Sequence, residues 1–221
     1  MFIGHFAVGL AGKKAGPEFS LGTWVLAAQW IDLLWPLFLL LGLERVQIDP
    51  GNTPVTPLDF VQYPYTHSLL AVLGWSAAMY LFARFVLGAQ PKPSFLLGLA
   101  VLSHWVLDFL SHRPDLPLYP GGVERVGLGL WYSPVGTLLV ESALFAGGIW
   151  LYLNATGNRP RPAGLGFWGF IVLLVVIYLG NLFGPPPPAG SESLIAWMAL
   201  SQWVLVFWAY WLDRPAKRIN P

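Results

Sequence analysis

The sequence has no cysteine and very little charge. With no cysteine among its 221 residues, the chain can form neither disulfides nor thiolate metal sites. Only 10% of its residues are charged, whereas soluble globular proteins carry about a quarter. No basic patch of the kind that binds nucleic acid stands out along the chain. These absences exclude a disulfide-stabilised fold and an ordinary soluble domain, and they give no support for nucleic-acid binding.

What the sequence has instead is apolar length. Hydrophobic residues make up 56% of the chain, the mean hydropathy is +0.59, and apolar stretches recur at the roughly 20 residues that a bilayer requires. In lipid, helices satisfy their own backbone hydrogen bonds, so we expect an all-α, polytopic membrane helix bundle. It should form a single integral membrane domain over residues 1–221. Six transmembrane helices are predicted, at about residues 21–43, 65–88, 94–112, 133–154, 163–184 and 192–212.

A short apolar segment precedes these spans. Residues 1–12 are too few to cross the bilayer, and the segment has neither a charged start nor a convincing cleavage site, so we do not expect a signal peptide. We predict a short re-entrant or interfacial helix that carries His5. Twelve helical residues extend about 18 Å, which is enough to bring His5 to the bilayer midplane if the N-terminal end dips into the bundle.

The basic residues predict the orientation of the chain. Six spans place both termini on one side, and that side also receives most of the lysines and arginines, so the positive-inside rule makes it the cytoplasmic side of a bacterial plasma (inner) membrane. The two long connections, at residues 44–64 and 113–132, would face outward. The nine basic residues on the cytoplasmic side are Lys13, Lys14, Arg84, Lys92, Arg159, Arg161, Arg214, Lys217 and Arg218.

Ionisable residues lie within or beside the apolar segments, where burial is costly unless a ligand or partner compensates. His104 and Asp108 are four residues apart, so they share one helix face, and His112 continues the same line. A single bound cation would explain why so many ionisable residues occur in apolar segments. The set includes all four histidines of the chain and consists of His5, Asp32, His67, His104, Asp108, His112 and Glu141.

Each member also has a plainer interpretation. His5 could be an interfacial residue, and His67, in a Thr-His-Ser sequence after a proline, could cap a helix or face water. Asp32 could hydrogen-bond Gln29, and we expect Pro36 to kink the first span close to it. Glu141 could be a structural partner of Arg125 or of a backbone amide.

Imidazole nitrogens and carboxylate oxygens without thiolates suit zinc, with manganese and iron as alternatives. The predicted metal ligands are His5, Asp32, His67, His104 and Asp108. Asp108 could also bridge a second ion, completed by His5, His112 or Glu141. A spare carboxylate or His112 could transfer protons, which makes Asp108, His112 and Glu141 the candidate catalytic residues.

The order of these motifs resembles a family. A histidine in a short N-terminal apolar segment, a buried aspartate in the first span, T-H-S at the next helix start and H-x-x-x-D in the following helix are similar to the YdjM-type family of predicted bacterial inner-membrane metal-dependent hydrolases. The loop sequence SHRPDLPLYPGG adds to the resemblance, which covers residues 1–122.

The same order is distantly similar to the ligand order of zinc-dependent phospholipases C. This resemblance implies that Asp32, His67, His104 and Asp108 hold one ion, and that His5 belongs to a second ion bridged by Asp108. The chain departs from that pattern because it has no histidine after His112. One or two ions are therefore expected rather than three.

These observations predict a membrane-embedded metal-dependent hydrolase. Its substrate would be a lipid or another amphipathic small molecule, most plausibly a phospholipid or a lipid-linked phosphoester. Two alternatives use the same ligands: a divalent-cation transporter, and a non-enzymatic membrane protein with a structural metal site.

Overall fold

The computed structural model describes residues 1–157 and 161–212, without the side chains of residues 161–163. It confirms an all-α bundle in which five helices are long and apolar enough to cross a membrane, or six if one bent helix pair is a single span. The helices are α1 (Ile3–Ala15), α2 (Leu21–Ala28), α3 (Trp30–Leu40), α4 (Leu69–Leu81) with its π-helical end (Phe82–Val86), α5 (Pro91–Ser111), α6 (Pro134–Thr156), α7 (Arg161–Phe183), α8 (Glu192–Leu200) and α9 (Gln202–Leu212).

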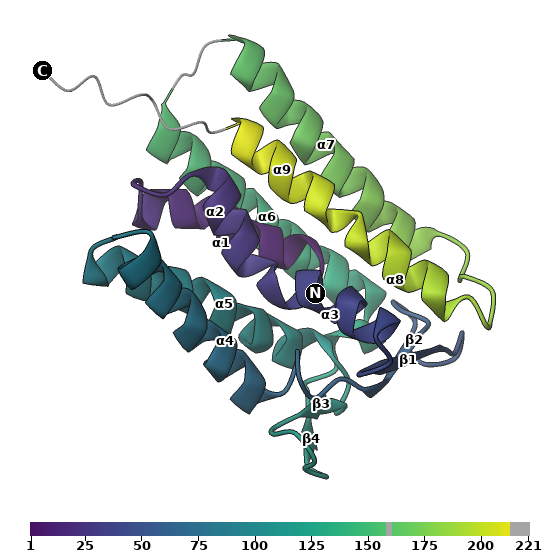
Figure 1. The fold of residues 1–221 in the computed structure, drawn as a ribbon. Coiled ribbons are helices and arrows are strands. Elements are labelled where there is room, and N and C mark those ends of the chain that lie inside the picture. The colour runs from purple at the N-terminus through teal and green to yellow at the C-terminus, as the bar shows by residue number, and fades with distance from the viewer. Residues whose placement is uncertain (158–160, 213–221) are drawn as a thin grey trace, which may run out of the picture.

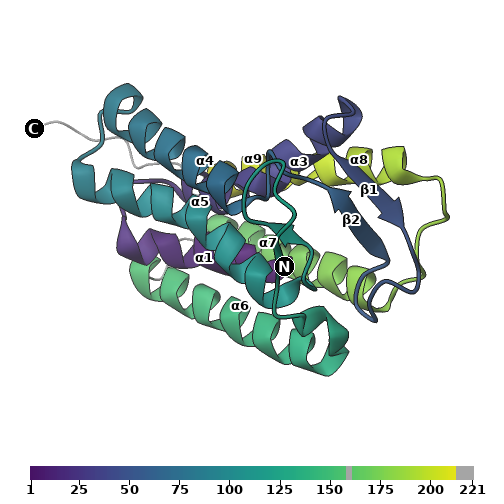
Figure 2. The ribbon, with the colours of Figure 1, turned by 90° about the horizontal axis from the view of Figure 1, so that it is seen from below.

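Helix α1 does not cross the bundle but enters it. Its N-terminal end lies in the middle of the molecule, and the helix runs between α5 and α6 (Figures 1 and 2). Helices α1 and α6 approach each other closely at Gly148. A Cβ atom there would lie 2.6 Å from the carbonyl oxygen of Ala7, so only glycine fits. This arrangement carries His5 into the bundle, where it is 1% exposed.

The first predicted span is broken rather than smoothly kinked. Helices α2 and α3 meet at Gln29 with a bend of 54°. The expected kink at Pro36 is therefore misplaced, because α3 continues through that proline. Pro36 has no amide hydrogen to give to the carbonyl of Asp32, four residues earlier, but the packed helix tolerates this loss. The break instead frees the end of α2 to contact the candidate site.

The two long connections are more structured than loops. The first contains an antiparallel hairpin of β1 (Arg45–Ile48) and β2 (Leu58–Gln62), and the second contains β3 (Leu116–Pro117) and β4 (Arg125–Val126), followed by a 3₁₀ turn (Leu130–Tyr132). Both hairpins lie at the same end of the bundle (Figure 1). The opposite end has the α1–α2 turn and the α4–α5 link.

The orientation of this bundle in a membrane stays a prediction. Four of the basic residues that argue for cytoplasmic termini, Arg159, Arg214, Lys217 and Arg218, lie outside the described residues, and the side chain of Arg161 is not described.

Candidate metal centre

Four parts of the fold bring ionisable side chains together. Helix α1 provides His5, α3 provides Asp32, the turn before α4 provides His67, and α5 provides His104 and Asp108. Ser68, not His67, caps α4, because the Ser68 side chain accepts the amide hydrogen of Ala71. His67 is thereby left available to the centre of the bundle.

The carboxylate of Asp108 lies at the middle of this group. Its Oδ1 atom is 3.0 Å from Nε2 of His5, and its Oδ2 atom is 3.2 Å from Nε2 of His104 and 3.8 Å from Nε2 of His67. The Oδ1 atom of Asp32 is 3.5 Å from Nε2 of His104 and 3.6 Å from Nε2 of His67. Two overlapping groups could therefore hold a metal ion: His5, His104 and Asp108, and Asp32, His67 and His104.

Oδ1 of Asp108 is hydrogen-bonded to the Met1 ammonium at 2.5 Å and to Nε2 of His5 at 3.0 Å, whereas the separations that join Asp32 and Asp108 to His67 and His104 match a coordination shell. Ligand atoms about 2.1 Å from a tetrahedral ion lie about 3.4 Å from one another. The four carboxylate–imidazole distances that join Asp32 and Asp108 to His67 and His104 run from 3.2 to 3.8 Å. Within the described residues, the buried Nε2 of His104 has no hydrogen-bond partner. An imidazole nitrogen left this way between two carboxylates fits a cation.

The tautomer of His104 is fixed from outside the centre. Its Nδ1 atom lies 3.0 Å from the carbonyl oxygen of Ala28, the last residue of α2. A carbonyl can only accept, so Nδ1 carries a hydrogen, and in the neutral ring Nε2 presents its lone pair to the centre. The helix break at Gln29 thus leaves the carbonyl of Ala28 available to accept the hydrogen bond from His104. Gln29 itself is buried, and neither of its side-chain amide atoms is hydrogen-bonded to a described residue, including Asp32.

Glu141 places α1 rather than touching the ligand atoms. Its Oε2 atom accepts the amide hydrogens of Phe2 at 2.9 Å and Gly4 at 3.2 Å, which are among the unpaired donors at the start of the helix. The structure thus realises the backbone-amide alternative for Glu141, whereas Arg125 donates to backbone carbonyls of its own loop. Glu141 therefore contributes to the centre by holding the helix that carries His5.

His112 lies at the edge of the centre, with Nε2 4.0 Å from Oδ1 of Asp108. Its Nδ1 atom donates to Oδ1 of Asp115 at 3.0 Å, and Asp115 also accepts from the hydroxyl of Tyr63 at 2.9 Å and from Nε of Arg113 at 3.2 Å. Burial lowers the pKa of His112, so its ring is neutral near pH 7. Its Nε2 lone pair is thus free to bind a metal or accept a proton.

The structure therefore gathers every predicted metal ligand, with His112 beside them and Glu141 one helix away. Sequence reasoning missed the supporting roles of Glu44, Tyr63, Thr66 and Asp115, which lie in or directly after the two long connections. Asp115 had a weak signal, because it follows His112 by three residues. Glu44 had none, because a carboxylate next to a loop is unremarkable until its burial is known.

Access to the centre is uneven. The side chains of His5, His67, His104 and Asp108 are at most 4% exposed, whereas that of Asp32 is 21% exposed. The centre therefore has one more open side, at Asp32. No protein-family model, curated protein or solved structure matches this chain, so the residues and geometry alone carry the functional argument.

Proposed function

We propose that the protein is a membrane-embedded, metal-dependent hydrolase of the YdjM-type family, and that it cleaves a phospholipid or a lipid-linked phosphoester. The observation that carries this proposal is the convergence of three imidazoles and two carboxylates in two overlapping groups, each of which could hold a metal ion. Such groups are costly to bury together without a cation.

We propose zinc as the metal, because the ligands are nitrogen and oxygen atoms without thiolates. Asp32, His67, His104 and Asp108 would hold one ion. Asp108, with its two oxygens directed to different histidines, would share a second ion with His5 and His112. Zinc supplies a water activated near neutral pH and polarises a phosphoryl oxygen.

The protein residues around such a centre have separable roles. His112 is neutral and is held by Asp115, so it is suited to accept or donate a proton at Nε2. Phe60 and Trp131 pack against the His112 ring, with centroid distances of 4.9 and 4.2 Å, and limit the access of water from the hairpin end. Asp32, the most open of the proposed ligands, marks the side from which a substrate would enter.

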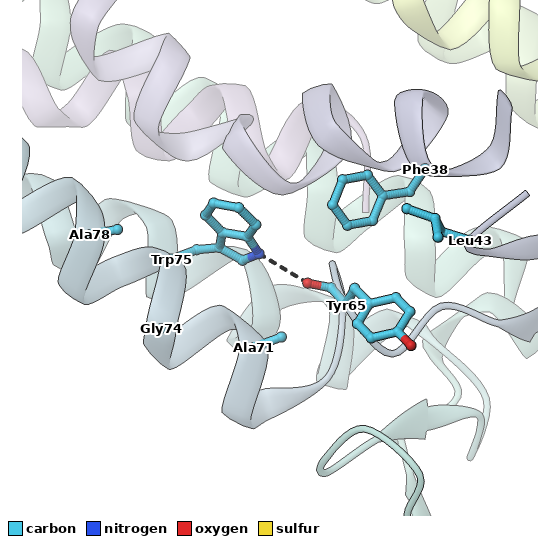
Figure 3. Close-up of a pocket in the computed structure, with 7 residues that line it drawn as sticks. All are labelled: Phe38, Leu43, Tyr65, Ala71, Gly74, Trp75 and Ala78. Carbon is cyan, nitrogen blue, oxygen red and sulfur yellow. Dashed lines mark hydrogen bonds between the residues drawn. The ribbon is translucent and has the colours of Figure 1, made fainter. Parts of the chain in front are cut away.

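A groove between α3 and α4 supports a lipid substrate (Figure 3). It has a volume of about 590 Å³ and almost wholly apolar walls. Tyr65 lines it, holds Trp75 through a hydrogen bond from the indole Nε1 to the Tyr65 carbonyl, and precedes Thr66 and His67 in the chain. One lining residue of the groove, Tyr65, is thus two positions from the proposed ligand His67 in the chain. Its lining residues are Phe38, Leu43, Tyr65, Ala71, Gly74, Trp75 and Ala78.

Helix α4, which forms one wall of the groove, also carries exposed apolar side chains. Leu70 and Leu73, on the same helix, are 59% and 45% exposed, and α4 with its π-helical end is apolar enough to cross a bilayer. An acyl chain is the natural occupant of such a surface, with its phosphoester directed towards His67. This placement favours a substrate that enters sideways from the bilayer.

The proposal is tested by assaying the purified protein in detergent against phospholipids and lipid-linked phosphoesters. We expect hydrolysis that a chelator abolishes and zinc restores, and that Asp108→Asn removes. Bound zinc without hydrolysis of any ester would favour the structural metal site, and zinc-dependent uptake into proteoliposomes would favour the transporter. The partial exposure of Asp32 argues against a saturated structural site.

A further inference from the structure

His67 reaches the metal centre from a turn that a buried glutamate organises. Glu44, at the start of the first connection and directly before β1, is a carboxylate that is only 2% exposed. Its Oε1 atom accepts the backbone amide hydrogens of Tyr65 at 2.8 Å and Thr66 at 2.9 Å. Its Oε2 atom accepts the hydroxyl hydrogen of Thr66 at 2.7 Å. A carboxylate in this position satisfies three donors of the turn, of which the two on Thr66 are buried.

The hydroxyl of Thr66 links this carboxylate to the ligand. Its Oγ1 atom also lies 2.7 Å from Nδ1 of His67, and Thr66 is fully buried. A hydroxyl has one hydrogen to give. Because that hydrogen goes to Glu44, Oγ1 must accept from His67, and Nδ1 of His67 must carry the hydrogen. Nε2 is then left with its lone pair, 3.6 Å from Asp32 and 3.8 Å from Asp108.

We infer that Glu44, acting through Thr66, is a positioning residue that fixes the metal-binding tautomer of His67. The inference rests on the proposed metal site but adds residues from outside it. Partners of this kind, which hold a ligating histidine by its second nitrogen, typically change metal affinity by about 10- to 100-fold when they are removed.

Three substitutions separate hydrogen-bond direction from simple packing. Thr66→Val keeps the shape of the side chain but removes the hydroxyl, whereas Thr66→Ser keeps the hydroxyl. In Glu44→Gln, the amide oxygen can still accept from the backbone, but the amide nitrogen can only donate to Oγ1. The Thr66 hydroxyl hydrogen, released from Glu44, is then available to Nδ1 of His67, which favours the tautomer with its hydrogen on Nε2 and blocks the ligand atom.

Thr53 offers a matched control. It lies in the same connection, is 6% exposed, and its hydroxyl donates to the carbonyl oxygen of Thr56, far from His67 in the hydrogen-bond network. Thr53→Val therefore makes the same chemical change at a buried threonine that holds no histidine.

The experiment combines zinc titration of the metal-free protein with ¹⁵N NMR of the histidine tautomers. We expect His67 of the metal-free wild type to carry its hydrogen on Nδ1, and Glu44→Gln to move it to Nε2. Thr66→Val and Glu44→Gln should weaken zinc binding by about 10- to 100-fold, whereas Thr66→Ser and Thr53→Val should remain close to wild type.

Wild-type tautomer populations and zinc affinity in Thr66→Val and Glu44→Gln would overturn the inference. If the wild type bound no zinc, the proposed function would fail, but the NMR spectra of the metal-free proteins would still decide whether Glu44 sets the tautomer. If Thr66→Val did not fold, Glu44→Gln would provide the same two measurements.

Discussion

The imidazole rings of His5 and His104 stack face to face, with centroids 3.7 Å apart and planes inclined by 5°. One ring comes from the short helix α1 and the other from the spanning helix α5. Both direct Nε2 towards Asp108, at 3.0 and 3.2 Å. Helix α1 therefore completes the centre by stacking the His5 ring on the His104 ring. A change that displaces α1 should disturb the metal site, and loss of the site should displace α1.

Replacing His5 with phenylalanine separates packing from metal binding. Phenylalanine keeps a flat ring against His104 but has no nitrogen to offer, so we expect His5→Phe to retain the wild-type thermal unfolding temperature. Zinc affinity, measured by titration of the metal-free protein, should fall by at least about tenfold. An unchanged affinity would remove His5 from the ligand set and return it to a packing role.

Removing the carboxylate of Glu141 should act on the same centre through α1. In Glu141→Ala the amides of Phe2 and Gly4 lose their shared acceptor, which we expect to cost about 1–3 kcal/mol in chemical unfolding. Zinc affinity should fall as well, because His5 is then less firmly placed. Glu141→Gln retains an acceptor oxygen and serves as the control that should lose much less of both. Lost affinity with unchanged stability would instead indicate direct contact between Glu141 and the ion.

The fold class and the members of the centre could be predicted from the sequence for one physical reason. Apolar length determines helices in lipid, and an ionisable group inside such a helix requires a partner. His104 and Asp108 are the best example, since helical spacing alone places them on one face. The sequence could not establish that His5, Asp32 and His67 lie close to that pair, because this proximity depends on how separate helices pack.

The details that the sequence did not predict are local and tertiary. The break at Gln29, rather than at Pro36, depends on packing and on the hydrogen bond between Ala28 and His104, which no pattern encodes. The two hairpins lie in the two long connections, for which no strands were predicted from the sequence. Glu44 was missed because nothing in the sequence distinguishes a buried loop carboxylate from a solvated one.

Filling the groove between α3 and α4 should selectively impair the hydrolysis of long-chain lipid substrates. A Cβ atom on Gly74 would meet no atom within 4 Å, so a side chain can start there without a clash, and Gly74→Leu also removes a helix-destabilising glycine. We expect the KM for a long-chain phospholipid to rise by about tenfold, equivalent to about 1.4 kcal/mol, with zinc content unchanged. A short-chain, water-soluble analogue should be hydrolysed as by the wild type.

Gly180 provides the matched control for this experiment. It is an exposed glycine in α7, and a side chain there would also meet no atom within 4 Å, but it lies outside the groove. Gly180→Leu should leave both substrates unaffected. If the two variants behaved alike, the groove would have no part in substrate entry.

Zinc retention should depend on pH with a defined sign. Protons compete with the ion for imidazole nitrogens, which have an ordinary pKa of about 6.5, so binding is complete above that range and weakens as the pH falls through it. The lowered pKa of His112 extends its contribution to more acidic pH. Dialysis of the zinc-loaded protein at a series of pH values, followed by elemental analysis, should show progressive loss below about pH 6. Retention that did not change down to pH 4 would argue against histidine ligands.

The most direct measurement is the zinc content of the purified protein, wild type beside His104→Ala. His104 belongs to both candidate ligand groups. We predict one or two zinc ions per wild-type chain, and a loss of most of that metal in a folded His104→Ala variant. A wild-type protein without bound metal, or a variant that kept the full wild-type content, would contradict the account.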